Sequence, residues 1–534
     1  MNIIKTLAIS AFLAILFSGC GGTAAIISTP VENIDTSPLK VSELTAYEKQ
    51  NWGHLDLVKD TIPGMSVNKA YTEIIKKKRG KTVIVAVIDS GMDIDHEDLD
   101  DVIWINKGEI PNNGKDDDKN GYVDDIHGWN FLGDGYYEQL EYVRLLASGD
   151  TSNPRYAEAQ ALYEKERQKY LGLKENYDGF LVQLTSADET ITKHLAKKNY
   201  TKEDVNAIKT EDKGLQQSIS IIKYAFTLDS SISKFKQQLK DGLEEFNNRL
   251  DYMLNKDYKG RLTGDNPNDL NDKFYGDGNI KQRKKSESHA THVAGIIAAE
   301  RNNKKGVNGV ANHVKIMAIR STPRGDEYDK DVALAIRYAV DNGAKVINAS
   351  FGKSFSPHSD WVRDAIAYAG KKDVVFVHAA GNDGKNVDIE PNFPDDNING
   401  KEVSDTYIRV AALASKYGSN LVAGFSNYGK QNVDVFAPGD AIYSTMPENE
   451  YDFQGGTSMA APAVAGVAAL IRSYYPGLSA AQVKQIIMDS GLALKTKVIV
   501  GGDTSNIKPF SDLTKSSKMV NAYNALIMAA KLAK

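Results

Sequence analysis

A short run of β-branched residues near the start of the chain constrains the fold more than any other feature. Residues 81–89 read KTVIVAVID and are continuously apolar from Val83 to Ile88. Such a run is too short for a buried helix. A strand with one solvent-exposed face would alternate between apolar and polar residues. The run therefore predicts a strand that is buried on both faces, as in a parallel sheet covered by helices.

The same texture recurs in the second half of the chain. Strands are expected at 314–319, 345–349 and 374–378, and helical periodicity covers 331–342 and 360–370. Strands that alternate with helices at this spacing are typical of βαβ units. We therefore expect an α/β domain with a parallel sheet.

Residues 137–261 differ in composition from the segments on either side. Gly and Pro become rare there, and Lys, Glu, Gln and Leu dominate. Apolar residues recur in steps of mostly three and four over 156–184 and again over 215–253, which is the pattern of a coiled-coil-like seam. Two such runs predict a long antiparallel helical hairpin inserted into the α/β domain. A stripe of tyrosines along the first run is expected to pack inside the hairpin; a face for an unknown partner is the alternative.

The first 20 residues have the composition of an export signal. Lys5 precedes an apolar run over 6–17, which is shorter than the roughly 20 residues that a membrane-spanning helix needs. Ser18 and Gly19 then lead to Cys20, and this stretch resembles the lipobox of bacterial lipoprotein signals. The resemblance implies a lipid on Cys20 and a cell-envelope protein, facing the periplasm or the outside. A conventional signal peptide, and hence a secreted protein, is the alternative.

These patterns divide the chain into five segments. They are a signal peptide (1–20), a tether (21–50), the first part of the α/β domain (51–136), the helical insertion (137–261) and the second part of the α/β domain (262–534).

Charge and cysteine content exclude several classes of function. The chain has 65 Lys and Arg against 70 Asp and Glu, a net charge of −5. This balance excludes a nucleic-acid-binding protein that depends on neutralising phosphates. The single cysteine excludes a disulfide framework and any Cys-rich zinc or iron–sulfur site.

Three short segments contain the candidate catalytic residues. Asp89 ends the predicted buried strand, where catalytic groups collect in open α/β sheets. His289 and His292 open an apolar helix, so they could be a base with a packing partner, or zinc ligands. Ser458 follows two glycines at the start of a helix of small residues, which leaves its hydroxyl approachable. The order Asp, His, Ser is one of the orders in which a catalytic triad occurs.

Together these segments resemble the subtilase family of serine peptidases. The matching motifs are Asp89-Ser90-Gly91, the segment HATHVAG at 289–295 and the segment GTSMAAP at 456–462. Three supporting segments also match: NASFG at 348–352, AAGN at 379–382 and FAPG at 436–439. The resemblance covers roughly 52–135 and 260–530. It implies a subtilisin-like α/β fold of three layers, in which a mainly parallel sheet carries helices on both faces.

The resemblance also implies roles for individual residues. Ser458 is the nucleophile, His289 the general base and Asp89 the residue that orients the histidine. Asn382 donates to the oxyanion, and Ser350, Phe351 and Gly352 bind the substrate backbone. His292 is expected to be structural.

Two departures from the family pattern matter. The family usually has Gly where this chain has Ala290, which puts activity in doubt if that position requires a positive φ. The stretch between Cys20 and Trp52 is too short for the folded pro-domain that many secreted members carry. We therefore hypothesise that the helical insertion supports folding or gates the cleft instead.

An acidic stretch follows the first catalytic segment. Residues 116–125 read DDDKNGYVDD, with oxygen-bearing side chains at alternate positions and a glycine at the sixth, like the front half of a calcium loop. We expect Asp116, Asp118, Asn120 and Asp125 to bind a structural Ca²⁺; a solvated acidic turn is the alternative.

The sequence therefore predicts an exported, lipid-anchored serine endopeptidase that needs no cofactor for catalysis. Its expected partners are protein or peptide substrates and, through the lipid, a membrane. Two other functions are open. One is a non-catalytic envelope protein that uses the hairpin as a binding arm, and the other is a zinc hydrolase built on His289 and His292.

Overall fold

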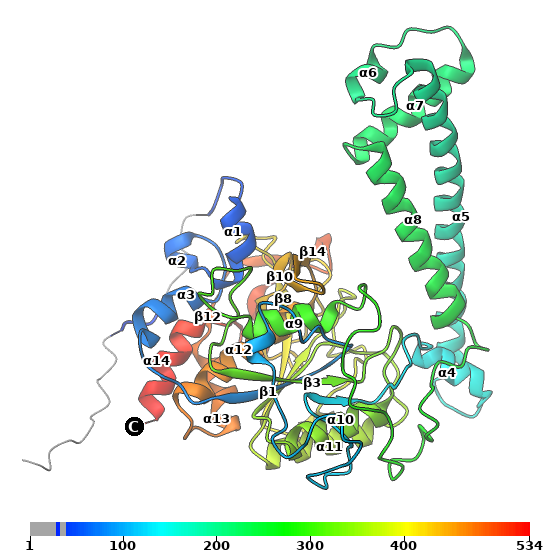
Figure 1. The fold of residues 1–534 in the computed structure, drawn as a ribbon. Helices are drawn as coiled ribbons and strands as arrows, with labels where there is room; N and C mark the ends of the chain where they lie inside the picture. Colours follow the sequence, from blue (N-terminus) through cyan, green and yellow to red (C-terminus); the bar gives the residue numbers. More distant parts are fainter. Residues whose placement is uncertain (1–27, 32–38, 534) are drawn as a thin grey trace, which may run out of the picture.

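The computed structural model describes residues 28–31 and 39–533 (Figure 1). The expected signal peptide and Cys20 lie outside these described residues. A nine-stranded sheet forms the centre of the body, and an arm of helices projects from one side of it. None of the described helices is long and apolar enough to cross a membrane.

The sheet is almost entirely parallel. Its strands run in the order β12-β15-β9-β8-β5-β4-β1-β3-β2, and only β12 and β15 pair in the antiparallel sense. The bounds are β1 Val83–Asp89, β2 Gly128–Asn130, β3 Val314–Arg320, β4 Val346–Ala349, β5 Val375–Ala379, β8 Tyr407–Leu413, β9 Val435–Pro438, β12 Leu492–Ala493 and β15 Lys518–Met519. The predicted strands at 81–89, 314–319, 345–349 and 374–378 are thus β1, β3, β4 and β5.

Helices cover both faces of the sheet, as expected. Val85 and Val87 of β1 belong to a core cluster that also contains residues of α9 (His289–Ala298), α12 (Thr457–Tyr474), α13 (Ala480–Ser490) and α14 (Ala522–Leu532). Ala86 and Ile88 face the other way and pack with α10 (Asp329–Asp341) and α11 (Ser359–Lys371). Because successive side chains of a strand point to opposite faces, this confirms the prediction of a strand buried on both sides and a three-layer α/β fold.

Shorter strands and helices surround this core. Three antiparallel pairs are β6 (Asn397–Ile398) with β7 (Lys401–Glu402), β10 (Ile442–Met446) with β11 (Glu450–Gln454), and β13 (Lys497–Val500) with β14 (Asp503–Pro509). The short helices of the body are α1 Ala46–Asn51, α2 Leu57–Asp60, α3 Val67–Ala70 and α4 Glu141–Ser148. Among the described residues, five further segments are 3₁₀ or π-helical: Trp52–His54, Tyr71–Ile75, Asp100–Val102, η5 (Arg249–Met253) and Phe510–Asp512.

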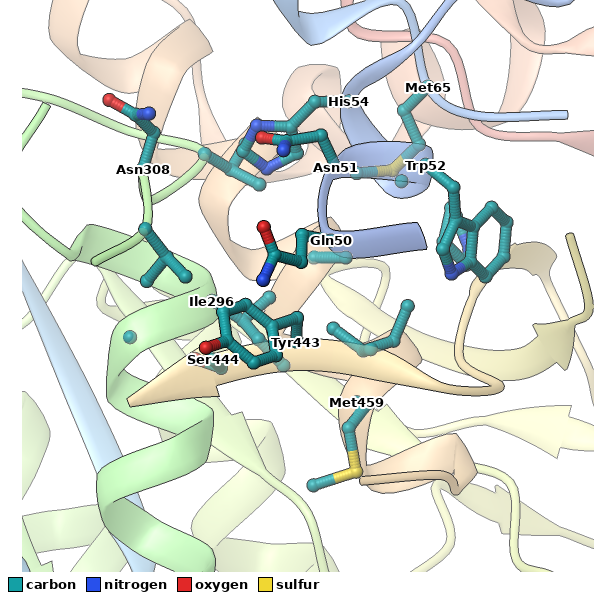
Figure 2. A pocket seen from close by; sticks show the side chains of 17 residues that line it. Gln50, Asn51, Trp52, His54, Met65, Ile296, Asn308, Tyr443, Ser444 and Met459 are labelled. Carbon is teal, nitrogen blue, oxygen red and sulfur yellow. The ribbon is translucent and has the colours of Figure 1, made fainter. Parts of the chain in front are cut away.

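The folded part of the chain begins closer to the N-terminus than the composition predicts. Residues 46–50, which we expected in the tether, belong to α1 (Ala46–Asn51), because Thr45 and Glu48 make a reciprocal capping box. The following residues pack behind α9 and α12. There Trp52, His54 and Met459 line a cavity of about 40 Å³ (Figure 2), large enough for only a few water molecules. Residues of this segment therefore share the lining of one small cavity with residues of α9 and α12.

The arm is the predicted helical insertion. Its helices are α5 (Tyr156–Leu195), α6 (Lys202–Asn206), α7 (Lys213–Leu228) and α8 (Ile232–Asn248). With 40 residues, α5 is about 60 Å long, and it runs beside α8 from the body to the tip, where α6 and α7 lie (Figure 1). Tyr170 and Tyr177 of the tyrosine stripe lie against Phe246 of α8, with ring centroids 6.0 and 4.9 Å apart.

The second run of the insertion is not one helix. It breaks between α7 and α8, where the Ser231 side chain accepts a hydrogen bond from Lys234 N and caps the new helix. Serine and aspartate favour such caps because their side chains satisfy free backbone N–H groups. The tip is therefore a small bundle, whose buried cluster includes Leu184, Ile191 and Ile222.

Candidate active site

Three neighbouring strands end beside one cleft. β1, β4 and β5 are parallel, so their last residues, Asp89, Ala349 and Ala379, lie at the same edge of the sheet. A cleft of about 640 Å³ opens there. All the residues predicted for catalysis, oxyanion binding and substrate binding line it: Asp89, His289, Ser350, Phe351, Gly352, Asn382 and Ser458.

Asp89 and His289 form a hydrogen-bonded pair. His289 Nδ1 lies 2.8 Å from Asp89 Oδ1, which also accepts a hydrogen bond from Ser90 N at 2.7 Å. Asp89 is almost fully buried, and His289 is the first residue of α9. Because an ionised carboxylate only accepts hydrogen bonds, it holds the proton on Nδ1 and leaves Nε2 of the neutral ring free to accept a proton.

The same contact changes the basicity of the histidine. Burial favours the neutral ring and would lower the pKa of His289, but the charge of Asp89 and its hydrogen bond outweigh burial and raise this pKa above its usual 6.5. A raised pKa makes the imidazole a stronger base toward the proton of a hydroxyl group.

Ser458 lies at the start of α12, where the helix places its positive end. Its Oγ donates a hydrogen bond to the backbone carbonyl of Ser350 at 3.0 Å, and its own carbonyl accepts one from Ser350 Oγ at 2.9 Å. A carbonyl cannot take the proton, so attack requires the hydroxyl to turn toward His289, which lines the same cleft. Catalytic hydrogen bonds commonly tighten only when substrate binds.

Asn382 is held in one orientation by Thr457. Its Oδ1 accepts hydrogen bonds from Thr457 N at 2.8 Å and from Thr457 Oγ1 at 3.0 Å, so its Nδ2 faces away from this contact. A Cβ on Gly456 would lie 3.4 Å from Asn382 Nδ2 and 3.6 Å from Ser458 N. Both nitrogens thus lie within 3.6 Å of one point beside the serine. Two N–H donors directed at one oxygen stabilise negative charge on it.

The segment from Ser350 to Gly352 directly continues β4 into the cleft. Gly352 is required by a close approach, since a Cβ there would lie 2.9 Å from the carbonyl oxygen of Phe393. The next residue, Lys353, exchanges two backbone hydrogen bonds with Phe393, at 3.0 and 2.9 Å. The segment therefore has a fixed backbone on which a peptide can align.

His292 and Ala290 take structural places in α9. His292 is fully buried, and its Nε2 lies 3.0 and 3.2 Å from the carbonyl oxygens of Ile442 and Asp452. Burial and the charge of His289 lower its pKa to about 3, so the ring is neutral. The His292 ring therefore contacts β10 and β11, and it is not placed to bind a metal ion together with His289. Ala290 has a helical backbone, which alanine adopts without strain.

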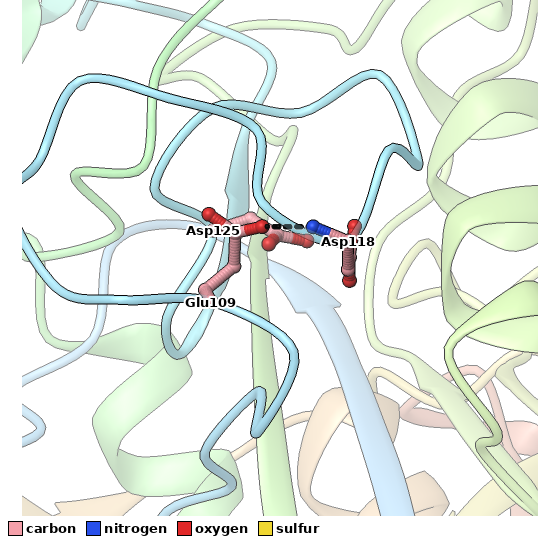
Figure 3. A group of neighbouring side chains, drawn as sticks. All are labelled: Glu109, Asp118 and Asp125. Atoms are coloured by element: carbon pink, nitrogen blue, oxygen red, sulfur yellow. Dashed lines mark hydrogen bonds between the residues drawn. The ribbon is translucent and has the colours of Figure 1, made fainter.

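The acidic loop brings together a set of carboxylates that differs from the prediction. Glu109, Asp118 and Asp125 each place one oxygen within 4.8 Å of the others (Figure 3), and Asn120 Nδ2 donates to both aspartates. Asp116 lies outside this group, because its carboxylate accepts hydrogen bonds from the backbone N–H groups that follow. Burial raises the pKa of Asp125 to about 6, with hydrogen bonds from Tyr338, Asn120 and Asn106 opposing the shift.

Sequence reasoning missed two of these residues. Thr457 precedes Ser458 in a motif that we quoted, but only the fold shows that it orients Asn382 across 75 positions. Glu109 precedes the acidic stretch in a loop with no pattern of its own, and it joins the cluster by accepting from Asp117 N, Asp118 N and Asp124 N.

Comparison with known proteins finds a family model and several relatives that match this chain. The model of the Subtilase family matches residues 80–507. The chain is 42% identical over 201 residues to a thermophilic serine proteinase of Bacillus sp. strain AK1, a match that covers 38% of this chain and 46% of the relative. It is 40% identical over 200 residues to thermitase of Thermoactinomyces vulgaris (37% and 65% covered). It is also 37% identical over 221 residues to subtilisin DY of Bacillus licheniformis (41% and 76% covered). The chain thus spans less than two thirds of the first two relatives.

The Asp89–His289 contact predicts how the histidine titrates. We expect the imidazole of His289 to titrate above pH 6.5, and the Asp89→Asn variant to titrate at lower pH because the neighbouring charge is gone. A raised pKa also stabilises the folded state. This contribution is complete below pH 6.5 and is lost as the pH rises through the pKa of the folded protein. NMR titration and urea unfolding at a series of pH values measure both effects. An unchanged His289 pKa in Asp89→Asn would contradict this account.

Proposed function

The chain belongs to the subtilase family, and on this premise we propose that it is a serine endopeptidase that uses Asp89, His289 and Ser458. The observation that carries the proposal is the 2.8 Å contact between His289 Nδ1 and Asp89 Oδ1 in the cleft that Ser458 and Asn382 also line. A serine hydroxyl is a weak nucleophile, and an oriented imidazole beside it supplies the base that it lacks.

The first half of the reaction makes an acyl-enzyme. Ser458 Oγ bonds to the carbonyl carbon of the peptide while its proton passes to His289 Nε2. The carbonyl π electrons move to the oxygen, where Asn382 Nδ2 and Ser458 N donate hydrogen bonds. His289 then gives its proton to the leaving nitrogen, the C–N bond breaks and the new amine departs. Water repeats the sequence in the second half: it gives a proton to His289 and attacks the ester carbon. The bond between this carbon and Ser458 Oγ then breaks, His289 returns its proton to Oγ, and the carboxylic acid product departs.

Asp89 acts through His289 at every step. When His289 takes a proton it becomes an imidazolium, and the buried carboxylate stabilises that charge without accepting the proton itself. The substrate backbone is proposed to align along Ser350, Phe351 and Gly352 as an added strand, which favours extended segments over folded ones.

We further propose that Glu109, Asp118 and Asp125 bind a structural Ca²⁺. The donor set fits a hard cation, since three carboxylate oxygens lie within 4.8 Å of one another and the buried Asp125 has a raised pKa in the absence of a cation. The ion would hold the loop that follows β1 and would take no part in the chemistry.

Export and anchoring through Cys20 are also part of the proposal. Their support is the lipobox-like stretch that ends at Cys20. Protein or peptide segments outside the cytoplasm would be the substrates, and the membrane a partner through the lipid.

Labelling with a fluorophosphonate probe tests the proposed activity. The probe reacts fast only with an activated serine, so the protein should be labelled and Ser458→Ala should not. Asn382→Ala should keep the labelled serine but lower kcat for peptides by about 10²–10³, as for loss of one oxyanion donor. Absence of labelling in the folded wild-type protein would favour a non-catalytic role for the fold.

Calcium binding is tested by thermal unfolding. Ca²⁺ should raise Tm and EGTA should reverse the rise, with about 2.7 kcal/mol of stabilisation at a hundredfold excess over Kd. Asp118→Asn should abolish the response, because it removes a charged ligand from the cluster. Asp257→Asn removes an exposed carboxylate elsewhere and should respond like the wild type. An equal response of both variants would contradict a site at this loop.

A further inference from the structure

The helical insertion contributes to the cleft itself. We call the stem the residues that lead into α5 (136–144) and out of α8 (245–258). Tyr136, Glu245 and Met253 of the stem line the same 640 Å³ cleft as His289 and Ser458. The insertion is therefore more than a projecting arm, since its base forms one wall of the candidate active site.

One edge of the cleft is bound to the stem through backbone and side chain. Arg324, in the loop that follows β3, donates from its N to the Tyr136 carbonyl at 2.7 Å, and Glu138 N donates to the Arg324 carbonyl at 3.1 Å. The Arg324 guanidinium also forms an ion pair with Glu245 of α8. This edge thus takes its position from both ends of the insertion.

At this edge the backbone of the loop after β3 packs closely against the backbone of the stem. Gly325 has φ +150°, and a Cβ there would lie 2.0 Å from the carbonyl oxygen of Glu138. The two ends of the stem are in turn joined by Tyr137 and Tyr252, whose rings stack with centroids 4.0 Å apart. Movement of α8 relative to the loop would therefore disturb the wall.

The segment that continues β4 is also bound to the stem, by a buried charge network. Lys353 directly follows the segment Ser350–Gly352, and its side chain is only 2% exposed. Its Nζ donates to Glu141 Oε2 at 2.8 Å and to the Glu327 carbonyl at 2.7 Å. Arg144 and Lys353 hold the pKa of Glu141 at about 2 against the effect of burial, so the network is ionised. Glu141 is thus a positioning residue for the segment proposed to align the substrate.

We propose that the stem is the specificity element of this peptidase, with Glu245, Arg324 and Met253 forming a binding site for peptide residues remote from the scissile bond. The inference rests on the proposed function and names its substrate class as extended peptide segments, in contrast to short esters or dipeptides. Met253 and Phe351 offer the apolar part of this wall. The ion pair between Glu245 and Arg324 holds the guanidinium at the wall of the cleft.

A substrate-length comparison tests this inference. Glu245→Gln breaks the ion pair, and Glu244→Gln makes the same change at the neighbouring exposed position, which does not line the cleft. With a peptide of about eight residues, which spans some 25 Å when extended, Glu245→Gln should raise KM about two- to fivefold, as for loss of a partly exposed ion pair. Its kcat, its kinetics with a single-residue ester and its fluorophosphonate labelling should match those of Glu244→Gln.

Exchanging the charges of Glu245 and Arg324 gives a second test. Glu245→Arg and Arg324→Glu should each raise KM for the long peptide, and the double variant should recover because the ion pair is restored with reversed charges. Equal effects of Glu245→Gln on long and short substrates, or no effect on the long one while labelling is intact, would overturn the inference alone. Loss of labelling in the wild-type protein would instead contradict the proposed function.

Discussion

The hydrogen bond between Asp89 and His289 joins residues that lie 200 positions apart, and most of the intervening chain is the helical insertion. For this bond to form, the end of β1 and the start of α9 must meet after the insertion has left the body and returned. The stacked rings of Tyr137 and Tyr252 hold its two ends together at that point. The contact that makes His289 basic therefore depends on how the insertion is closed at its base.

A buried ion pair supports the same junction. Glu287, two positions before His289, accepts hydrogen bonds from Gly91 N at 2.8 Å and from Arg320 Nε at 2.9 Å. It thereby links the loop after β1, the end of β3 and the segment that leads into α9. Burial lowers the pKa of Arg320, and the charge of Glu287 opposes this shift. Such a pair is costly to bury, and removing one partner would leave an uncompensated charge beside the candidate active site.

Much of the fold was predictable because its signals are local. The apolar run that became β1 determines burial on both faces, and the motifs around Asp89, His289 and Ser458 each occupy a few consecutive residues. What could not be predicted depends on contacts between distant parts of the chain. Glu109 reaches the acidic cluster through backbone N–H groups, while Asp116, which has the expected spacing, turns its carboxylate to the following N–H groups. The contact of Lys353 with Glu141 spans 212 positions and leaves no trace in either local pattern.

Trapping of the acyl-enzyme tests the central claim most directly. The protein is mixed with an activated ester, quenched in acid and examined by intact-mass and peptide-mapping mass spectrometry. The account predicts a mass increase of one acyl group, located on Ser458, that accumulates before steady-state turnover and is absent in Ser458→Ala. Ester turnover at the wild-type rate by Ser458→Ala, or an acyl group located on another residue, would contradict it.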